Sequence, residues 1–530
     1  MFSLFECALT FTFVSVVSST GVSCSSITNL NIPGTNILSI TGNIVLNYTV
    51  PAVPPVLLSP INGLNFCSVT VVLTHPNEND TVTTTIWLPL SGWNGRFQGT
   101  GGGGFSAGLG PLGLGSAIQG GYSAGSTDGG NLGLFFDILP AALTSNGSIN
   151  WPLIEDFGSR SVHDMAVIGK AVTEQYYGTP PLFSYFGGCS NGGREGYAAA
   201  QKYPRDFDGV MAASPVPGFA KISVAAMWPY TVMVQEKTVP SECVFNAFVN
   251  ASIAQCDGLD GVLDGIISDV ESCFYDPYTL VGKQVACDGE IVTIDEATSK
   301  VVQMVHDGLT SPSGEKLWSG QNWGTGFVGL YVGNLATSTQ NGTTTPIIPE
   351  GSSQYIKYLL KRDPSFDISS LSYADLTALF HQSVAEYEAI LGAGNPDLSG
   401  FRDAGGKLLS WHGLADSLIY PNGTVLYRQE VDALMGGTEA VSEFYRLFLA
   451  PGVNHCGGGY GPVPTDPLGA LVAWVENGTV PETIAGQFTD GVGDVVWRDI
   501  CYYPLVSRYD GHGDPKVASS YDCSTSRGLV

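Results

Sequence analysis

The alternation of apolar and polar residues predicts strands in the first part of the chain. Residues 67–90 contain the segments VTVVLTH and TVTTTIWLPL, whose apolar positions recur at every second residue, as in antiparallel strands with one buried face. Residues 161–177 instead carry apolar positions at helical spacing and predict a helix. Between these segments, from Gly101 to about Gly133, the chain is rich in glycine, so we expect loops with little helix.

The following segments predict an alternation of strand and helix. PLFSYFGG (181–188) favours a short strand, GREGYAAAQKYP (193–204) a helix and GVMAASP (209–215) a buried strand. Strand, helix and strand at this spacing are typical of a βαβ unit, so we expect a parallel sheet. The same order returns later, with predicted elements at residues 406–413, 424–435, 444–452 and 468–475.

The middle of the chain, residues 216–398, interrupts this order. It combines cysteine pairs, an Asp-rich loop, helices and long polar loops. We therefore expect an α/β fold in which residues 21–215 and 399–530 form the catalytic domain and residues 216–398 form an inserted lid domain. The length of 530 residues fits two domains or one large domain with an insertion.

Composition restricts the class of partner. The chain has 22 basic and 48 acidic residues, which gives a formal net charge of −26, and 44% of its residues are hydrophobic. These values predict a globular protein. Nucleic acids and anionic membranes bind clustered Lys and Arg, so we expect neither of them as a partner.

The first residues predict secretion. An apolar run at residues 8–17 is followed by small residues, which is typical of a signal peptide at 1–20 with cleavage between Ser19 and Ser23. The region before this run has Glu6 and no Lys or Arg, unlike most signal peptides, and a buried first strand is the alternative. No later stretch is apolar for about twenty residues, so we expect no transmembrane span.

Cysteines and glycosylation sequons agree with an extracellular location. Of the 11 cysteines, Cys7 lies in the predicted signal peptide, and the ten that remain are an even number. That number favours five disulfides in an oxidising compartment, although spacing does not give their connectivity. N-x-Ser/Thr sequons, each a common chance match, occur at Asn47, Asn79, Asn146, Asn250, Asn341, Asn422 and Asn477.

Ser190 is the candidate nucleophile. G-x-S-x-G motifs are centred on Ser106, Ser123 and Ser190, and about one such match is expected by chance in a chain this rich in glycine. A nucleophile elbow requires a strand before the serine and a helix after it. We predict both at Ser190, whereas Ser106 and Ser123 are expected in glycine loops with no helix following.

The helix after Ser190 predicts one side of an oxyanion hole. Its N-terminus would direct free N–H groups at a developing oxyanion, and the N–H of Asn191 is the expected first donor. The glycine run Gly101–Gly104 suits a second donor, because backbone approaches a substrate closely where side chains are lacking. The alternative for this run is a flexible turn.

An acid and a base follow in the C-terminal part. Asp416 lies after a predicted strand in WHGLADSLIYP (411–421), and His455 lies in PGVNHCGG (451–458). The order Ser, Asp, His is that of α/β-hydrolases, not that of chymotrypsin or subtilisin. His412 competes for the role of base, but it precedes the acid loop, where this fold places no base. The alternative for His455 is a histidine on a surface loop.

Two cysteines flank the candidate residues and lead to a resemblance. Cys189 directly precedes Ser190 and Cys456 directly follows His455, so a disulfide would join nucleophile and base. This Cys-Ser, Asp, His-Cys arrangement resembles the signature of the tannase and feruloyl esterase family. Over roughly residues 24–525, more motifs follow in the family's order: WNGRFQGTGGGG, INW, GGCSNGGREG, the Asp-rich loop, GGKLLSWHGLAD, GVNHCGGG and ALVAWVENG.

The resemblance carries further expectations. It implies an α/β-hydrolase core with an inserted lid that supplies the substrate pocket, and Gly104 as the second oxyanion donor. It also implies five disulfides, of which Cys243–Cys287 is closer to the tannase branch of the family. The other disulfides that it implies are Cys24–Cys67, Cys189–Cys456, Cys256–Cys273 and Cys501–Cys523.

The Asp-rich loop, CDGLDGVLDGI (256–266), is a candidate calcium site. Its three carboxylates and its glycines could wrap a hard cation, which binds six to eight oxygens, but the spacing is not that of an EF-hand. From spacing alone, a solvated acidic turn is an equal alternative. The resemblance implies a structural Ca²⁺ that fixes the lid, held by the carboxylates of Asp257, Asp260 and Asp264 and the carbonyls of Val262 and Ile266.

Together these features predict a secreted serine carboxylic ester hydrolase that acts on esters of phenolic acids, such as the ferulate esters of plant cell-wall polysaccharide. A tannase, which cleaves galloyl esters, is the alternative, and terephthalate monoesters are substrates in one branch of the family. A peptidase on the same fold and a catalytically inactive binding module are the other classes. We expect no organic cofactor, and the sequence does not predict an oligomeric state.

Overall fold

The computed structural model describes residues 22–54, 56–287, 289–326 and 333–526. The predicted signal peptide and Cys7 lie outside these residues. Among the described helices, none combines the length and the apolar character that a membrane span requires.

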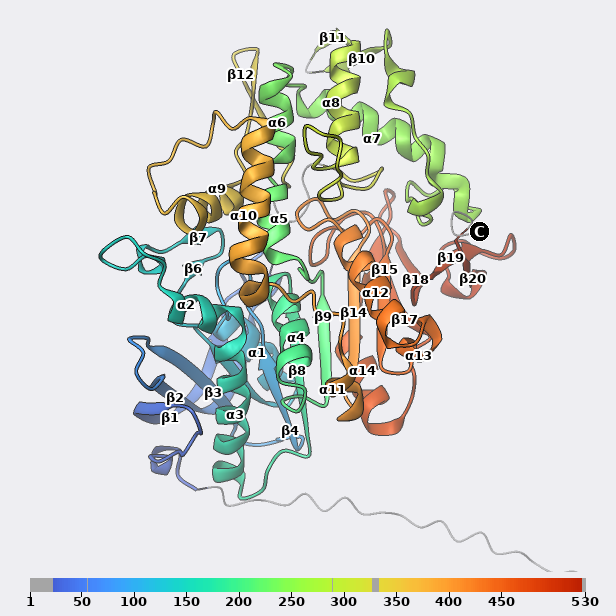
Figure 1. Ribbon diagram of the computed structural model, residues 1–530. Coiled ribbons are helices and arrows are strands. Elements are labelled where there is room, and N and C mark those ends of the chain that lie inside the picture. Colours follow the sequence, from blue (N-terminus) through green and yellow to red (C-terminus); the bar gives the residue numbers. More distant parts are fainter. Residues whose placement is uncertain (1–21, 55, 288, 327–332, 527–530) are drawn as a thin grey trace, which may run out of the picture.

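A sheet of nine strands forms the centre of the molecule (Figure 1). In spatial order, its strands are β1 (Asn36–Val50), β2 (Ile61–Thr74), β3 (Val82–Pro89), β5 (Ser123–Thr127), β4 (Arg96–Thr100), β8 (Phe183–Cys189), β9 (Gly209–Ala213), β14 (Lys407–Gly413) and β15 (Tyr445–Ala450). The pairs among β1, β2, β3 and β5 are antiparallel. From β5 to β15 every pair is parallel.

The predicted βαβ unit is present as β8, α4 and β9, where α4 spans Asn191–Lys202. Tyr185 of β8 lies opposite Gly209 of β9 in parallel register, and the next strand, β14, pairs Leu408 with Val210. These parallel strands, with helices between them, confirm the predicted α/β-hydrolase fold.

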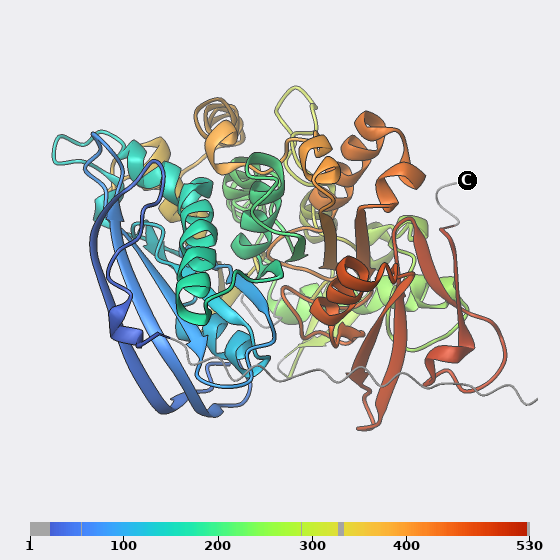
Figure 2. The same ribbon diagram turned by 90° about the horizontal axis from the view of Figure 1, so that it is seen from below.

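Helices cover both faces of the sheet, as Figure 2 shows. On one face, α3, α4 and α12 bury residues such as Met165, Tyr197 and Val431 against the strands. On the other face, α1 and α14 bury Leu114 and Trp474. The helices outside the middle segment are α1 (Pro111–Gln119), α2 (Trp151–Glu155), α3 (Ser161–Tyr177), α4, α11 (Ser399–Asp403), α12 (Asn422–Met435), α13 (Thr438–Ser442) and α14 (Pro467–Asn477).

Residues 216–398 form a separate layer over one end of the sheet, green to gold in Figure 1. Within the described residues, this segment adds no strand to the large sheet. Its apolar residues, such as Trp228 and Leu379, share one cluster with Phe105 and Phe157, so this layer packs on the loop of Phe105 and the helical turn of Phe157. Its elements are α5 (Phe219–Ala225), α6 (Trp228–Gln235), α7 (Glu242–Cys256), β10 (Gln284–Cys287), β11 (Glu290–Thr293), α8 (Glu296–Asp307), β12 (Thr337–Gln340), β13 (Thr343–Pro346), α9 (Glu350–Tyr355) and α10 (Tyr373–Leu391).

The glycine-rich segment differs from the expectation, because it contains the helix α1 and the central strand β5. Close packing explains both, since a Cβ at Gly115 would lie 2.6 Å from Val50 and a Cβ at Gly125 would lie 2.8 Å from the sulfur of Met165. The expectation that Ser123 lies in a loop is therefore wrong: it begins β5 and is fully buried. Glycine is required here for tight packing and not for a turn.

The C-terminal part contains strands that the sequence did not predict. They lie on the opposite side of the molecule from β1 and β2, in red in Figure 2. The elements outside the large sheet and the lid are β6 (Gly133–Leu134), β7 (Asp137–Ile138), β16 (Val463–Pro464), β17 (Thr483–Thr489), β18 (Val495–Cys501), β19 (Leu505–Tyr509) and β20 (Tyr521–Thr525).

Five disulfides cross-link the described chain, and they are the pairs that the resemblance implies. One ties the segment before β1 to β2, one joins the end of β8 to the loop after β15, two lie within residues 216–398, and one ties the C-terminal strands. The pairs are Cys24–Cys67, Cys189–Cys456, Cys243–Cys287, Cys256–Cys273 and Cys501–Cys523.

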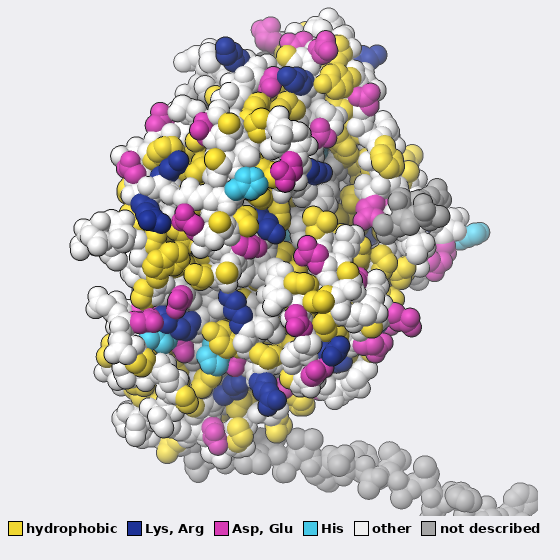
Figure 3. Space-filling model, in the orientation of Figure 1, with side chains coloured by type: hydrophobic (Ala, Val, Ile, Leu, Met, Phe, Trp, Pro, Cys, Tyr) yellow, Lys and Arg dark blue, Asp and Glu magenta, His cyan; other side chains and the backbone are white. Residues whose placement is uncertain are grey.

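The surface shows little clustering of basic charge. On the face seen in Figure 3, the described Lys and Arg side chains are scattered among Asp and Glu and form no large basic patch. This distribution agrees with the net charge of −26 and gives nucleic acid no binding surface on that face.

Candidate active site

Ser190 occupies a strained turn between β8 and α4. Its backbone has φ 64° and ψ −122°, and its N–H donates to the carbonyl of Ala213 at 3.0 Å. The turn is possible because its flanks are glycines: a Cβ at Gly188 would lie 2.7 Å from the backbone of Gly192. A non-glycine residue at positive φ beside a cavity is the geometry of a nucleophile elbow.

The hydroxyls of the other two serines of the same motif form hydrogen bonds elsewhere. Ser123 is buried in β5 and its hydroxyl donates to the carbonyl of Arg96 at 3.1 Å. The hydroxyl of Ser106 donates to the carbonyl of Gly108 at 2.9 Å. Ser190, by contrast, lines the mainly apolar cavity described below.

The structure brings Asp416 and His455 together. The first follows β14 and the second follows β15, which are neighbouring parallel strands, so their loops meet at one edge of the sheet. Nδ1 of His455 lies 2.8 Å from Oδ2 of Asp416. Both side chains are buried, with 2% of His455 and 0% of Asp416 exposed.

Asp416 is surrounded by donors. Its Oδ1 accepts from the N–H groups of Leu418 and Ile419 at 2.9 and 2.8 Å, while Oδ2 lies 3.1 Å from Nε2 of His412. Burial alone would raise the pKa of Asp416, but the charge of His455 and the hydrogen bonds of both histidines outweigh it and hold that pKa well below its usual range. The carboxylate therefore stays ionised.

A disulfide connects the loops of Ser190 and His455. Cys189 and Cys456 have Cα atoms 5.9 Å apart, and Cys456 has a positive φ of 58°. The N–H of Cys456 donates to the hydroxyl of Ser214 at 3.3 Å. The bond fixes the distance between the neighbours of the two candidate catalytic residues and holds a second strained residue beside the site.

Gly104 and Asn191 line the same cavity as Ser190. The glycine run can approach because side chains do not fit there: a Cβ at Gly102 would lie 1.9 Å from the carbonyl of Ser106, and a Cβ at Gly104 would lie 2.1 Å from that of Phe135. Gly104 also has φ 60°. Both predicted oxyanion donors thus line the cavity that Ser190 lines, and the glycine run is not an exposed turn.

The sequence analysis did not identify Glu195, whose carboxylate contacts both segments of the predicted oxyanion hole. Its Oε2 accepts from the N–H of Gly102 and its Oε1 from the amide of Asn191, both at 2.9 Å. Arg194 donates to the Asn191 amide oxygen at 2.7 Å. Burial raises the pKa of Glu195 to about 8 and lowers that of Arg194 to about 10. The available signal was an Arg-Glu pair in a helix whose neighbouring residues are mostly Gly and Ala, with Glu195 one helical turn beyond Asn191.

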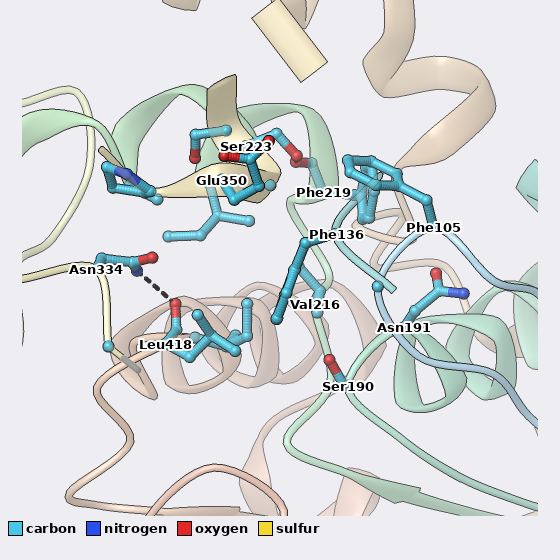
Figure 4. A pocket seen from close by; sticks show the side chains of 18 of the residues that line it. Phe105, Phe136, Ser190, Asn191, Val216, Phe219, Ser223, Asn334, Glu350 and Leu418 are labelled. Carbon is cyan, nitrogen blue, oxygen red and sulfur yellow. Dashed lines mark hydrogen bonds between the residues drawn. The ribbon is translucent and has the colours of Figure 1, made fainter. Parts of the chain in front are cut away.

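A cavity of about 500 Å³ opens at Ser190 between the catalytic part and the lid. Figure 4 shows Ser190 at one end, with Ser223 and Glu350 at the other. The wall between them is mainly apolar and carries three aromatic rings, those of Phe105, Phe136 and Phe219. Further lining residues include Val216, Ile222, Ala226, Asn334, Ile347, Ile348, Pro349, Leu418 and Ile419.

The Asp-rich loop holds carboxylates that lack sufficient partners. Asp257 accepts from the N–H groups of Asp264 and Gly265 at 3.1 and 3.0 Å, but the buried Oδ2 of Asp260 has no hydrogen-bond partner. Oδ2 of Asp264 lies 2.8 Å from Nη1 of Arg498 without hydrogen-bond alignment. Burial raises the pKa of Asp260 to about 6, and nearby Asp264 contributes to that rise. The oxygens of Asp260 and Asp264 that lack a hydrogen bond fit a cation, although Arg498 already forms an ion pair with Asp264.

A second acidic cluster lies elsewhere, at the end of β2. His75, Glu78 and Asp80 have ligand atoms within 4.8 Å of one another, the single group of this kind among the described residues. Burial alone would lower the pKa of His75, but hydrogen bonds to Asp164 and Asp80 outweigh it and raise the pKa to about 9. The imidazole is therefore protonated at neutral pH, and it pairs with the carboxylates of Asp80 and Asp164 in an ion-pair network.

Comparison with known proteins gives the family. Over residues 67–524 the chain matches the family described as "Tannase and feruloyl esterase". It is 46% identical to a probable feruloyl esterase of Arthroderma benhamiae over 95% of this chain and 94% of the relative. It is 31% identical to mono(2-hydroxyethyl) terephthalate hydrolase of Piscinibacter sakaiensis over 82% and 80%.

A solved structure agrees with the sequence relatives. Tannin acyl hydrolase from Aspergillus niger superposes with a TM-score of 0.83 at 26% identity, over 94% of this chain and 93% of that one. Fold, sequence and the elbow at Ser190 thus lead to the same conclusion. The chain belongs to the tannase and feruloyl esterase family and is a carboxylic ester hydrolase.

Proposed function

We propose that the chain hydrolyses esters of hydroxycinnamic acids such as ferulate, with Ser190 as nucleophile, His455 as base and Asp416 as its orienting acid. The elbow at Ser190, the 2.8 Å contact between His455 and Asp416, and the disulfide beside them support these roles. Asp416 accepts the Nδ1 proton of His455, which leaves Nε2 as the proton acceptor.

The reaction proceeds through an acyl-enzyme. Ser190 Oγ attacks the ester carbonyl carbon while its proton moves to Nε2 of His455, and the carbonyl electron pair becomes an oxyanion held by the N–H groups of Asn191 and Gly104. Collapse breaks the bond to the alcohol oxygen, which takes the proton from His455. Water then attacks the acyl carbon, gives a proton to His455, and releases the acid as Ser190 regains its proton.

The cavity is the observation that supports the substrate class. A hydroxycinnamoyl group has its carboxyl at one end, an apolar vinyl-aryl body and a phenolic hydroxyl at the far end. The cavity has the matching order, with Ser190 at one end, the rings of Phe105 and Phe219 along it, and Ser223 and Glu350 opposite Ser190 (Figure 4). A galloyl group carries three hydroxyls close to its carboxyl and would require polar partners along the wall.

The test is a comparison of kcat/KM for methyl ferulate and methyl gallate with purified protein, using Ser190→Ala as the control. We expect ferulate to be preferred at least about tenfold, since gallate hydroxyls would be desolvated against apolar side chains. Preference for gallate would make the protein a tannase. Hydrolysis of neither ester, together with labelling of Ser190 by a fluorophosphonate, would retain the chemistry and refute the substrate class.

We also propose that the Asp-rich loop holds a structural Ca²⁺, through carboxylates of Asp257, Asp260 and Asp264 and carbonyls of Val262 and Ile266. The orphaned oxygens of the loop support it. A cation there would neutralise the crowded carboxylates and fix the base of the lid. Chelation should lower the melting temperature, with added Ca²⁺ restoring it, whereas Asp260→Asn should abolish the calcium response; a melting temperature that ignores chelator and cation alike would refute the site.

We also propose that the protein is secreted and that its chain divides into a catalytic domain and a lid domain. Five disulfides support an oxidising compartment, and removal of residues 1–20 would leave ten cysteines, all of which are paired in the structure. The lid, proposed at residues 216–398, would carry the calcium site and the far wall of the cavity. The N-terminal sequence of protein recovered from culture medium tests the cleavage: it should begin between Ser19 and Ser23.

A further inference from the structure

A second histidine contacts the candidate catalytic acid. His412, on β14, is fully buried, and its Nε2 lies 3.1 Å from Oδ2 of Asp416 and 2.9 Å from the carbonyl oxygen of Ile419. The same Oδ2 lies 2.8 Å from Nδ1 of His455. One carboxylate oxygen is therefore shared by two imidazoles, of which the proposed mechanism uses one.

The neighbours of His412 fix where its hydrogen lies. Nε2 faces an ionised carboxylate and a carbonyl, which only accept, so Nε2 carries a hydrogen and donates. Nδ1 lies 2.9 Å from the hydroxyl of Thr424 on α12. That hydroxyl also lies 3.3 Å from the carbonyl of Pro215, so its rotation lets it donate to a bare Nδ1 or accept from Nδ1–H. In either case the Nε2 donor remains directed at Asp416.

We propose that His412 is a positioning residue for the ester hydrolysis: its Nε2–H fixes the plane of the Asp416 carboxylate and shares the charge of Oδ2 with His455. Two backbone N–H groups hold Oδ1, but on the side of Oδ2 the described donors are the two histidines. Without His412, the Oδ2 end can rotate together with the imidazole of His455. The imidazole then loses its fixed direction toward Ser190, at a cost in rate. This inference rests on the proposed function.

The shared oxygen also predicts the direction of a pH effect. The titratable groups that the described structure places around this carboxylate are His412, His455 and the phenol of Tyr420, whose pKa is raised by burial so that it stays neutral. Loss of the His412 donor leaves more negative charge on Oδ2 for His455. The protonated imidazole is then stabilised, so His455 becomes active as a base only at higher pH.

The test compares kcat, KM and the pH profile of kcat/KM for His412→Leu and His412→Gln on methyl ferulate. His412→Leu should lower kcat about 30-fold with KM changed less than about twofold, and should shift the acid limb upward by about half a unit. His412→Gln keeps an N–H near the position of Nε2 and should recover most of the rate. Thr424→Val removes the partner of Nδ1 at nearly constant volume and should cause a smaller change in the same direction.

His75→Gln is the matched control, because His75 is also a buried histidine bonded to carboxylates but lies away from the cavity. It should lower thermal stability and leave kcat and the acid limb unchanged. Wild-type kcat and acid limb in His412→Leu would overturn the proposal, as would equal rate losses in the Leu and Gln variants with an unmoved limb. Failure of the proposed function is distinct, because it would show as absent labelling of Ser190 by a fluorophosphonate in the wild-type protein.

Discussion

The two sides of the cavity are built differently. On the side of the catalytic part, Asp416 is fully buried and its two carboxylate oxygens receive four donors, and a disulfide ties the loops of Ser190 and His455. On the lid side, Glu350 is exposed and its described side-chain contact is one hydrogen bond from Gln354, at 2.7 Å. The first side holds its carboxylate in one position through several contacts, whereas the exposed carboxylate of Glu350 on the second side can exchange its one partner.

This contrast separates the residues proposed to carry out the reaction from the residues that would select the substrate. Groups that must keep one geometry through every turnover come from the ends of parallel strands, where neighbouring loops meet. Groups that distinguish one aromatic acid from another come from the inserted layer, whose side chains can change with little effect on the sheet. We therefore expect substitutions on the catalytic side to change kcat for all esters, and substitutions on the lid side to change the ratio between esters.

Removal of the nucleophile is the strongest test of the catalytic side. Ser190→Ala should lower kcat about 10⁵-fold on every ester, because attack by a bound water is all that remains. The melting temperature should stay within a few degrees of the wild type or rise, since the strained elbow loses no buried contact. Rates and melting curves on methyl ferulate and methyl gallate measure both effects. Substantial turnover by the variant would show that another residue attacks the ester.

Removing the disulfide beside the site should lower kcat for all esters. The double variant Cys189→Ala/Cys456→Ala removes the link between the loops of Ser190 and His455, and a displacement of about 1 Å between such groups costs about 100-fold in kcat.

The matched control is Cys501→Ala/Cys523→Ala, which opens a bond in the C-terminal strands. Each double variant should lose a comparable amount of stability, about 2–4 kcal/mol, as is typical for a native disulfide. The kcat of the control should stay within about twofold of the wild type. Rate losses that match in the two variants would mean that the first bond supports the fold and not the site.

The catalytic side was largely predictable from sequence, for a physical reason. The segments around Ser190, Asp416 and His455 are local patterns in which a strand is followed by a turn that carries the functional residue, and the predicted βαβ unit was found at β8, α4 and β9. The elements that were missed depend on tertiary packing. Helix α1 forms from PLGLGSAIQ because its glycines fit against neighbouring strands, which no propensity indicates.

The contacts that support the site could not be predicted from the sequence either. Glu195 contacts a glycine 93 positions earlier in the chain. His412 was considered as a competing base, but it lies between Asp416 and the hydroxyl of Thr424. Such contacts are set by how strands and helices pack, and one sequence does not reveal them. The sequence predicted an inserted segment at residues 216–398, but it did not predict which of its residues line the cavity.

Two histidines should make the catalytic part and the lid respond to pH in opposite directions. His75 has a pKa raised to about 9 by its carboxylates, so its contribution to stability is complete below about pH 6.5 and is lost as the pH rises through 9. In the lid, burial lowers the pKa of His306 to about 4, so the contribution of its neutral form is complete above about pH 6.5 and is lost as the pH falls toward 4.

Melting temperatures from pH 4 to 9 measure these contributions. His75→Gln should remove about 2 kcal/mol at pH 6 and flatten the alkaline side, and His306→Gln should flatten the acidic side. His306→Gln is the control on the alkaline side, and His75→Gln is the control on the acidic side. Profiles in which both variants flatten the same side would contradict the assignment of one histidine to each part.

The smallest expected effect lies on the lid side and concerns selection. Glu350→Ala removes an exposed carboxylate at the far end of the cavity from Ser190, where a phenolic hydroxyl of ferulate would donate to it. A hydrogen bond to an exposed carboxylate contributes about 1 kcal/mol, so kcat/KM for methyl ferulate should fall about fivefold. Methyl cinnamate, which lacks the hydroxyl, is the control substrate and should be unaffected. If both esters lost rate equally, Glu350 would support the lid and would not select the substrate, and the division between the two sides of the cavity would not hold at this residue.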